Sequence, residues 1–357
     1  MSIKSSLKKI IASLYMFSFE YFNRYKWLQS TYRKMISNYD KLKPLSSSQK
    51  KELKKEWGKY ANSKSFLIFN QYLKDGENIS DYIPMEYFLF KLEPYLNKYE
   101  AKFIDDKNYY DLLFPDIKQP KTVFRQIDGN FLDEKYNIIS KAEVFNIAKT
   151  FDRIIIKEAT LSMGGHGISF WTPKEGNDVL SKRMSISSNM IAQEVVKQHK
   201  VMNLLNKSSI NTLRIASLFI DGETHIVTQF VRIGCEGQLV DNVSSGGMYC
   251  GISDTGKLNE FGYNHLGTPC KTHPSGAIFN DITIPNYEEC IKTIKRLTPK
   301  MSNISKLQSW DIAITEDGEP LLIEPNFEYP DILVNQIACG PLFGSGELKK
   351  KMKNLVK

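Results

Sequence analysis

Two Asp-Gly dipeptides in the second half of the chain, each set between two apolar runs, constrain the fold of this chain more than any other feature. Asp221-Gly222 separates the runs at 212–220 and 224–231, and Asp317-Gly318 separates a second pair of such runs. Asp-Gly suits the positive φ angles of two-residue hairpin turns. The flanking runs are rich in β-branched residues, which favour strands. The sequence therefore predicts two β-hairpins in the second half of the chain.

The second hairpin carries a pair of carboxylates. With a two-residue turn, Asp311 lies opposite Glu324, and Asn326 lies on the same face as Glu324. Opposed carboxylates repel, so a divalent cation between them would explain the arrangement. Oxygen ligands of this kind suit Mg²⁺. The alternative is an exposed hairpin with incidental charges, which the apolar residues at alternate positions of both strands argue against.

A glycine-rich stretch at 162–167 separates two short apolar runs, the first of which leads into Lys157. Glycines let backbone N–H groups approach a phosphate closely, and Lys157 would add a positive charge. The stretch is neither a Walker A motif nor GxGxxG, so an ordinary hairpin turn is the alternative. The sequence predicts two strands joined by a loop that is a candidate phosphate site.

Arg214 and His273 are further candidates for binding a substrate. With a two-residue turn in the first hairpin, Arg214 lies on the polar face opposite Gln229. A guanidinium group there can bind a phosphate or a carboxylate through two hydrogen bonds, and a surface arginine is the alternative. The five histidines show no metal-ligand spacing, and His273 is the best substrate candidate among them.

The positive charge of the chain is concentrated in its N-terminal segment. The formal net charge is +8, but residues 1–60 alone hold fourteen Lys/Arg against four Asp/Glu. The slightly acidic remainder argues against nucleic acid as a partner. The five cysteines are far apart and include no CxxC, which argues against disulfides and zinc and favours a cytoplasmic protein. No apolar run is long enough to span a bilayer.

Residues 1–60 are expected to be helical. An aromatic and basic stretch runs from Lys8 to Lys34, and Ser46 and Gln49 then have the spacing of a capping box. Two interpretations of the aromatic side chains stay open. They pack on the main body, or residues 1–40 present a basic amphipathic face to an anionic membrane or a lipid-linked substrate.

Changes in pattern along the chain predict four segments and an α+β fold class. Residues 1–60 form a basic helical extension, and residues 61–150 form a small α/β lobe. Residues 151–205 hold the glycine loop. Residues 206–357 hold the two hairpins and with them the acidic pair.

The order of these motifs resembles the ATP-grasp superfamily, and in particular its sugar-transfer-associated branch. The resemblance covers roughly residues 100–340 and implies two α/β subdomains that clasp ATP. The residues that carry it are Asp106-Lys107, Ile156-Lys157-Glu158, Gly164-Gly165-His166-Gly167, Gln193-Glu194-Val195-Val196, Asn211-Thr212-Leu213-Arg214, Val240-Asp241-Asn242 with Gly246-Gly247, His273-Pro274, Trp310-Asp311 and Ile323-Glu324-Pro325-Asn326.

The resemblance also implies a role for each matched group. Two lysines and the glycine flap would contact the ATP phosphates, and a hinge would bind adenine. These nucleotide contacts are Lys107, Lys157, Gly164, Gly165, His166, Gly167, Gln193, Glu194 and Val196. Arg214 would steady the transferred phosphate together with Lys157. The implied magnesium ligands are Asp311, Glu324 and Asn326, and the implied acceptor-site residues are Asp241, Asn242 and His273.

One feature of the ATP-grasp pattern is missing. These enzymes often place a carboxylate for the ribose just after the hinge. This chain has Lys197, Gln198 and His199 there. The ribose contact is therefore unassigned from the sequence.

The activity implied by the resemblance is an ATP-dependent carboxylate–amine ligase with Mg²⁺ as cofactor. A substrate carboxylate would take the γ-phosphate, and an amine would then displace phosphate to give an amide. The substrates would be a sugar of capsule or O-antigen biosynthesis and an amino acid or amine. Two alternatives stay open: a small-molecule kinase on the same fold, and a non-catalytic membrane-associated scaffold.

Overall fold

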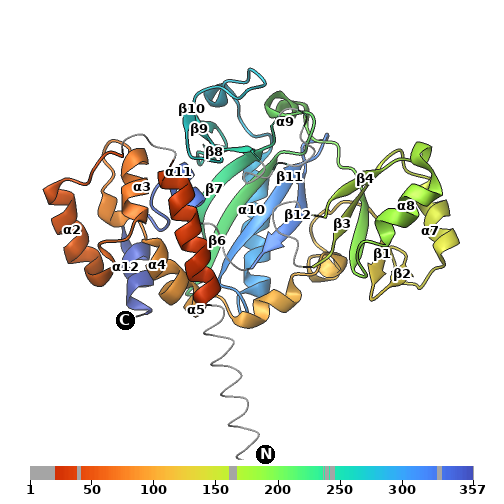
Figure 1. Cartoon of the computed structure of the whole chain (residues 1–357), viewed down its shortest axis with the longest axis horizontal. Coiled ribbons are helices and arrows are strands. Elements are labelled where there is room, and N and C mark those ends of the chain that lie inside the picture. Colours follow the sequence, from red (N-terminus) through yellow and green to blue (C-terminus); the bar gives the residue numbers. More distant parts are fainter. Residues whose placement is uncertain are drawn as a thin grey trace, which may run out of the picture. The chain divides into compact units, whose positions relative to one another are not determined.

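Figure 1 shows the computed structural model of the chain. It describes residues 21–356 apart from 38–41, 161–166, 236, 238–240, 242–245 and 328–331. The chain divides into two compact units, one of Met1–Leu96 with Asp331–Lys357 and one of Asn97–Pro330. The first is helical, and the second holds two sheets and their helices, which confirms the predicted α+β class. None of the described helices is long and apolar enough to cross a bilayer.

The smaller unit is built from helices, most of which bury apolar side chains. Residues 21–36 are helical and bury Leu28, Tyr32 and Met35. The predicted capping box is confirmed, because Ser46 and Gln49 satisfy each other's backbone N–H groups at the start of α2. The elements of this unit are α2 (Ser47–Trp57), η1 (Gly58–Tyr60), α3 (Ser65–Tyr72), η2 (Ile79–Asp81), α4 (Met85–Tyr87), η3 (Phe88–Leu92), α5 (Glu93–Leu96), α11 (Ile332–Cys339) and α12 (Glu347–Asn354).

The first sheet of the larger unit is antiparallel, with the strand order β2-β1-β5-β3-β4. The two strands predicted around the glycine-rich stretch, β3 and β4, pair directly, with Ile154 opposite Trp171. Two helices, α7 and α8, bury Val144 and Leu180 against this sheet (Figure 1). The bounds are β1 (Thr122–Ile127), β2 (Asn130–Leu132), α7 (Lys141–Ala148), β3 (Ile154–Glu158), β4 (Ser169–Trp171), η6 (Pro173–Glu175), α8 (Gly176–Met184) and β5 (Met190–Glu194).

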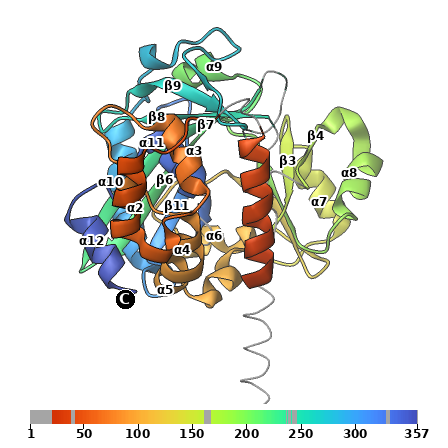
Figure 2. The ribbon, with the colours of Figure 1, turned by 60° about the vertical axis from the view of Figure 1, so that its left-hand side comes forward.

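The second sheet is also antiparallel, with the strand order β10-β9-β8-β7-β6-β11-β12. Helix α10 buries Ile294 and Leu297 in the core beneath this sheet and contacts β6, β7 and β11. Figure 2 shows the same ribbon turned by 60°. The bounds are β6 (Thr212–Ile220), β7 (Glu223–Ile233), β8 (Met248–Ile252), β9 (Leu258–Asn264), β10 (Pro269–Cys270), α10 (Tyr287–Met301), β11 (Leu307–Ile314) and β12 (Pro320–Asn326). Short helices elsewhere in the unit are η4 (Tyr99–Ile104), η5 (Lys107–Tyr109), α6 (Tyr110–Leu113), α9 (Lys200–Leu205) and η8 (Phe279–Asp281).

The first predicted hairpin, formed by β6 and β7, is confirmed. Its turn has two residues, and Asp221 and Gly222 take the positive φ angles of 52° and 82° that Asp-Gly favours. A β-bulge midway along the hairpin shifts the register by one residue. Arg214 consequently pairs with Phe230, so the predicted pairing of Arg214 with Gln229 is wrong.

In the second hairpin, formed by β11 and β12, the two carboxylates are paired as predicted, but the turn and the register that pair them differ from the prediction. Its turn has three residues, because the Thr315 N–H donates to the Glu319 carbonyl at 3.0 Å and Gly318 takes the left-handed position with φ 84°. The predicted two-residue turn is therefore wrong. A β-bulge beside Asp311 offsets the extra residue, so Asp311 still lies opposite Glu324 as predicted.

Candidate functional site

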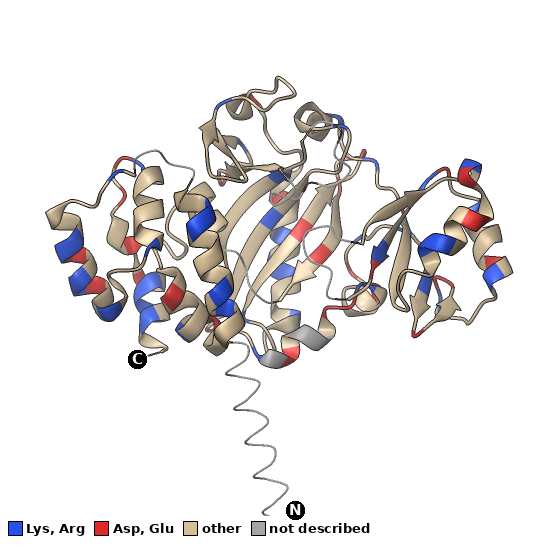
Figure 3. Ribbon diagram, viewed as in Figure 1, with Lys and Arg blue, Asp and Glu red and all other residues tan. Residues whose placement is uncertain are grey.

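Asp311 is fully buried and is held by two arginines. Arg214, its neighbour on β6, donates from Nε and Nη2, the latter at 2.9 Å, and Arg232 on β7 donates from Nη2 at 2.9 Å. Burial alone would raise the pKa of Asp311, but the two guanidinium groups outweigh it and hold the pKa below its ordinary value. Figure 3 shows acidic and basic positions on neighbouring strands of this sheet.

Glu324, the other member of the acidic pair, is held by Lys107. The Lys107 Nζ lies 2.9 Å from the Glu324 carboxylate, and Lys107 itself is largely buried. The backbone N–H of Lys107 donates to the Ala159 carbonyl at 2.9 Å, which fixes η5 against the end of β3. Burial alone would lower the pKa of Lys107, but Glu324 outweighs it and raises the pKa above its ordinary value.

Lys157, on β3 of the first sheet, is the second predicted phosphate-binding lysine of the site. Its Nζ donates to the Gln193 side chain on β5 at 3.1 Å. Burial lowers the pKa of Lys157 to about 8, against the opposing influence of Glu324 and with some help from Lys107. The structure therefore brings both predicted phosphate-binding lysines to the carboxylates of the second sheet. We call these lysines together with Arg214, Arg232, Asp311 and Glu324 the charge network.

The residues predicted to hold magnesium have the right donors. Asp311, Glu324 and Asn326 lie together, with the Asn326 amide nitrogen 3.4 Å from Asp311 Oδ2. The sequence suggested a cation to offset the two carboxylates, and here Lys107 and the arginines do so. In the described part of the chain no three His, Cys, Asp or Glu side chains gather as a metal cluster. A bound Mg²⁺ would therefore complete its shell with water and phosphate oxygens, as this ion commonly does.

The predicted acceptor-site residues are placed differently from one another. Asp241 joins the charge network, because its carboxylate lies 3.6 Å from Arg232 and accepts from the backbone and hydroxyl of Thr212. His273 is 2% exposed, and its Nδ1 accepts the Ser275 N–H at 3.1 Å within a tight turn. Burial lowers its pKa. Asn242 lies outside the described residues. The substrate roles of these three residues stay predictions.

Arg232 is the member of the charge network that sequence reasoning missed. It links Asp241 to Asp311 and pairs with Thr212 across the β6–β7 ladder. The sequence does place Arg232 on the strand that pairs with the strand of Arg214. The face of the sheet on which its side chain lies depends on the bulge in the first hairpin, however, and a bulge leaves no clear mark in the period-two pattern of a strand.

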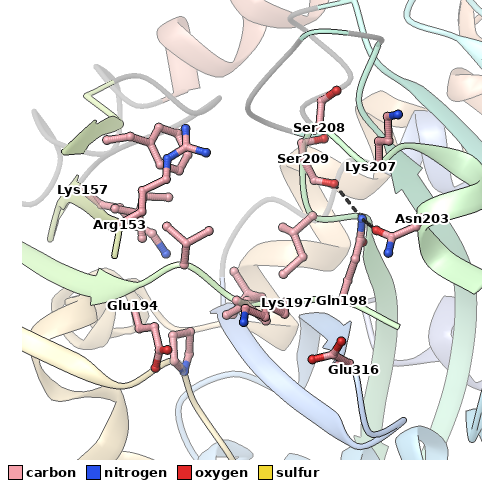
Figure 4. Close-up of a pocket in the computed structure, with 17 residues that line it drawn as sticks. Arg153, Lys157, Glu194, Lys197, Gln198, Asn203, Lys207, Ser208, Ser209 and Glu316 are labelled. Atoms are coloured by element: carbon pink, nitrogen blue, oxygen red, sulfur yellow. Dashed lines mark hydrogen bonds between the residues drawn. The ribbon is translucent and has the colours of Figure 1, made fainter. Parts of the chain in front are cut away.

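A cavity of about 380 Å³ lies next to the charge network. Figure 4 shows Arg153 and Lys157 on one side of it and Lys207, Ser208 and Ser209 on the other. The lining residues are Pro120, Arg153, Ile155, Lys157, Phe170, Glu194, Val195, Val196, Lys197, Gln198, Asn203, Lys207, Ser208, Ser209, Ile210, Glu316 and Ile323. Much of the wall is apolar and the remainder is polar or charged, which is typical of small-molecule sites.

Among the described residues of the predicted hinge and glycine flap, two predicted hinge contacts line this cavity. Glu194 and Val196 line it, whereas the Gln193 side chain binds Lys157. Of the flap, Gly164, Gly165 and His166 lie outside the described residues. Gly167 has φ 75°, and a Cβ there would come within 2.9 Å of the Glu158 side chain. This position therefore requires glycine on two counts.

The comparison with known families decides the membership of the chain. Residues 90–350 match the family described as sugar-transfer associated ATP-grasp. The chain belongs to this family. The membership confirms the resemblance inferred from the order of the motifs. No curated protein matches the sequence.

Solved structures similar to this ATP-grasp chain include three ligases, each covering 71% of it. The D-alanyl-alanine synthetase A from Vibrio cholerae is 13% identical with a TM-score of 0.41, and 63% of its chain is covered. The L-amino acid ligase from Bacillus licheniformis is 11% identical with a TM-score of 0.41 and 48% covered. The VanG D-Ala:D-Ser ligase from Enterococcus faecalis is 16% identical with a TM-score of 0.41 and 62% covered. The chain thus spans about half to two thirds of the length of these proteins.

Proposed function

We propose that this ATP-grasp protein is an ATP-dependent ligase that joins a carboxylate to an amine through an acyl-phosphate. The observation that carries the proposal is the continuity between the cavity and the charge network. On β3, Ile155 lines the cavity, and Lys157 follows two residues later on the same face. On β12, Ile323 lines the cavity and Glu324 follows directly. A base held between the isoleucines would extend its phosphates towards the lysines and arginines.

The segment after β5 supports adenine as the base. Val195 and Val196 line the cavity beside Glu194. Among the described residues, none accepts a hydrogen bond from the Val196 N–H. Val196 is half-buried and lines the cavity, so its N–H can donate to a ligand held there, and a ring nitrogen of adenine is a suitable acceptor at this position.

The chain's own residues supply positioning and positive charge for both steps of the reaction. First, a carboxylate oxygen of the acceptor attacks the γ-phosphorus, the bond to the bridging oxygen breaks, and ADP leaves with that electron pair. Second, the amine attacks the acyl carbon, phosphate leaves, and the nitrogen loses a proton. Lys107, Lys157 and Arg214 hold the phosphate oxygens. Phosphoryl transfer needs little more than such neutralisation and alignment.

Magnesium would be held by Asp311, Glu324 and Asn326. When bound, it would neutralise part of the phosphate charge. Lys107 and the two arginines now bound to these carboxylates would then turn to the phosphates. The same basic groups thereby serve as counter-charges to the carboxylates and as phosphate ligands.

We further propose that one substrate is a sugar of a capsule or O-antigen precursor and the other an amino acid or amine. The family's description as sugar-transfer associated supports the sugar. Asp241, Asn242 and His273 are the proposed acceptor-site residues.

We also propose that successive segments of the chain begin at residues 61, 151 and 206, as the sequence predicts.

The test is an ADP-release screen of amino acids against uronic acids and amino sugars, followed by mass spectrometry of the products. A ligase gives ADP, free phosphate and an amide in equal amounts. A small-molecule kinase, the alternative reaction on this fold, gives a phosphorylated product and no free phosphate. A wild-type protein that neither binds nor hydrolyses ATP would overturn both and favour the scaffold alternative.

The helical unit supports a second proposal, that the protein works at the cytoplasmic face of an anionic membrane. The helical residues 21–36 expose four aromatic side chains by 45–52%, beside the exposed basic side chains of Lys26, Arg33 and Lys34. The Lys26 ammonium lies 4.3 Å from the centre of the Phe22 ring. Aromatic rings with flanking cations favour the headgroup region of anionic bilayers. The exposed aromatic residues are Tyr21, Phe22, Tyr25 and Trp27.

Substitution tests this membrane contact better than truncation, because the same helix buries Leu28 and Tyr32 in the unit's core. A triple change of Phe22, Tyr25 and Trp27 to serine should abolish sedimentation with vesicles that contain phosphatidylglycerol. Pure phosphatidylcholine vesicles should bind the wild type weakly. A control that changes the exposed Ile138 and Ile186 to serine should bind normally. Equal binding of the triple variant and the wild type would contradict the proposal.

A further inference from the structure

The cavity contains a carboxylate that no motif of the sequence assigns. Glu316 lies in the three-residue turn of the second hairpin and lines the cavity together with Lys197 and Asn203. Figure 4 places it beside the segment of Lys197 and Gln198 that follows the hinge. Glu316 is exposed, and among the residues that the structure describes none forms an ion pair with its carboxylate.

The side chains that directly follow Lys197 are already committed to the fold. The Gln198 amide donates to Asn203, Asn206 and Ser209 at 2.7–3.0 Å. Its oxygen accepts from the backbone and side chain of Asn211. Neither end of this amide is left to bind a ligand.

The next residue, His199, is committed as well. Its Nδ1 accepts the Val201 N–H at 3.2 Å and so caps α9. Gln198 and the Nδ1 atom of His199 therefore have structural tasks, and the segment after the hinge offers no carboxylate, so a carboxylate for the sugar of a nucleotide would come from another element.

The turn of the second hairpin is fixed against this same segment by the backbone. The Glu316 N–H donates to the Lys197 carbonyl at 3.0 Å, and the His199 N–H donates to the Ile314 carbonyl at 2.9 Å. Between them, Thr315 forms a β-bridge with Gln198. These bonds hold the Glu316 carboxylate at the edge of the cavity next to the hinge, without help from its own side-chain contacts.

We propose that Glu316 binds the vicinal hydroxyls of the nucleotide's ribose and so gives the site its preference for ribonucleotides. The inference rests on the proposed function, because it assumes that the cavity holds ATP. A carboxylate has two oxygens that each accept a hydrogen bond, which suits a pair of adjacent O–H donors. Acidic residues recognise ribose in this way in dinucleotide-binding folds.

The test compares ATP with 2′-deoxy-ATP and 3′-deoxy-ATP for the wild type, Glu316→Gln and Glu316→Ala. The wild type should favour ATP by about tenfold or more, as expected for a hydrogen bond to a charged group. In both variants this preference should fall to about twofold or less. The binding of the deoxynucleotides should change little. The readouts are dissociation constants from calorimetry and KM values from ADP release.

Asp317→Asn is the matched control, since Asp317 is an exposed acid of the same turn that does not line the cavity. It should keep the wild-type preference. A wild-type preference that persists in Glu316→Ala would overturn the assignment of Glu316 and leave the ligase proposal standing. A wild type that fails to bind ATP at all would instead overturn the proposed function.

Discussion

Asp311 and Arg214 lie opposite each other on adjacent strands and form a two-point ion pair, with 2.9 Å between Nη2 and Oδ2. The same carboxylate also accepts from Arg232. Guanidinium groups bind phosphate as readily as carboxylate. The carboxylate and an incoming phosphate therefore compete for the same arginines, and we expect nucleotide binding to depend on the charge of Asp311.

Asp311→Asn should lower the rate of ADP formation by at least about 100-fold, because it removes both a proposed magnesium ligand and the counter-charge that orients Arg214. Glu324→Gln should do the same. Both rates are measured by coupled ADP release, and circular dichroism checks that the fold persists. Glu319→Gln is the control, since Glu319 is an exposed acid of the same hairpin. Near wild-type turnover in either variant would show that the metal assignment is wrong.

ATP affinity should fall as the pH rises through about 8. Lys157 has a pKa of about 8 in the folded protein, below its ordinary 10.5, because it is buried. Between these values the unfolded chain holds the proton and the folded chain does not, so this lysine makes stability rise with pH there. A nearby phosphate favours the charged form, so ATP binding at pH 8.5 should take up a proton.

Calorimetry in two buffers with different ionisation enthalpies measures this uptake. Lys157→Met should bind ATP more weakly at pH 7 and should show no uptake at pH 8.5. If the wild type and Lys157→Met release or take up the same number of protons, Lys157 is not the group that responds to the phosphate.

Lys107→Met should bind Mn²⁺ several-fold more tightly than the wild type when no nucleotide is added. Lys107 occupies Glu324 at 2.9 Å, so it competes with a cation for that carboxylate. The KM for ATP should rise roughly tenfold in the same variant, as expected for one charge-assisted hydrogen bond. Electron paramagnetic resonance measures free Mn²⁺. Lys118→Met, which removes an exposed lysine paired with Glu319, should leave both quantities unchanged.

Arg232 and Asp241 should act as a unit. Arg232 joins Asp241 to Asp311, so removing either end disturbs the same connection. Arg232→Lys and Asp241→Asn should each lower kcat/KM, and the double variant should lose little more than the worse single one. A double-mutant cycle should give a coupling energy of about 1 kcal/mol. Additive losses would mean that the two residues act separately.

Gly262→Ala should destabilise the larger unit by about 2 kcal/mol, because an added Cβ would lie 2.5 Å from the buried Phe279 ring. Urea unfolding followed by circular dichroism measures the change. Gly346→Ala is the control, since a Cβ there meets nothing within 4 Å. Gly346 is the N-cap of α12, where alanine costs at most about 1 kcal/mol, so the control should be less destabilised than Gly262→Ala.

The strands of both hairpins could be predicted from their apolar, β-branched runs, and their ends from Asp-Gly. The opposition of Asp311 and Glu324 was also correct, but it was reached through two errors that offset each other. The turn is one residue longer than predicted, and the bulge beside Asp311 restores the register. The first hairpin has a bulge but no extra turn residue to offset it, so the predicted partner of Arg214 was wrong by one residue.

The counter-charges of the site could not be predicted from local patterns. The acidic pair suggested a metal ion because only the hairpin itself was visible in the sequence. Lys107 meets Glu324 across a separation of more than half the chain, and only the tertiary fold reveals such a contact. The commitment of Gln198 and His199 to structural hydrogen bonds is equally invisible in the sequence, and so is the position of Glu316 beside them.

The bulge beside Asp311 has a consequence for how this hairpin can vary. A one-residue shift in a strand moves every later side chain to the other face of the sheet. Shortening the turn by one residue without removing the bulge would take the acidic pair out of opposition, and losing the bulge alone would do the same. Relatives of this protein should therefore carry the long turn and the bulge together, or neither of them. We therefore expect insertions and deletions in this hairpin to be inherited as pairs.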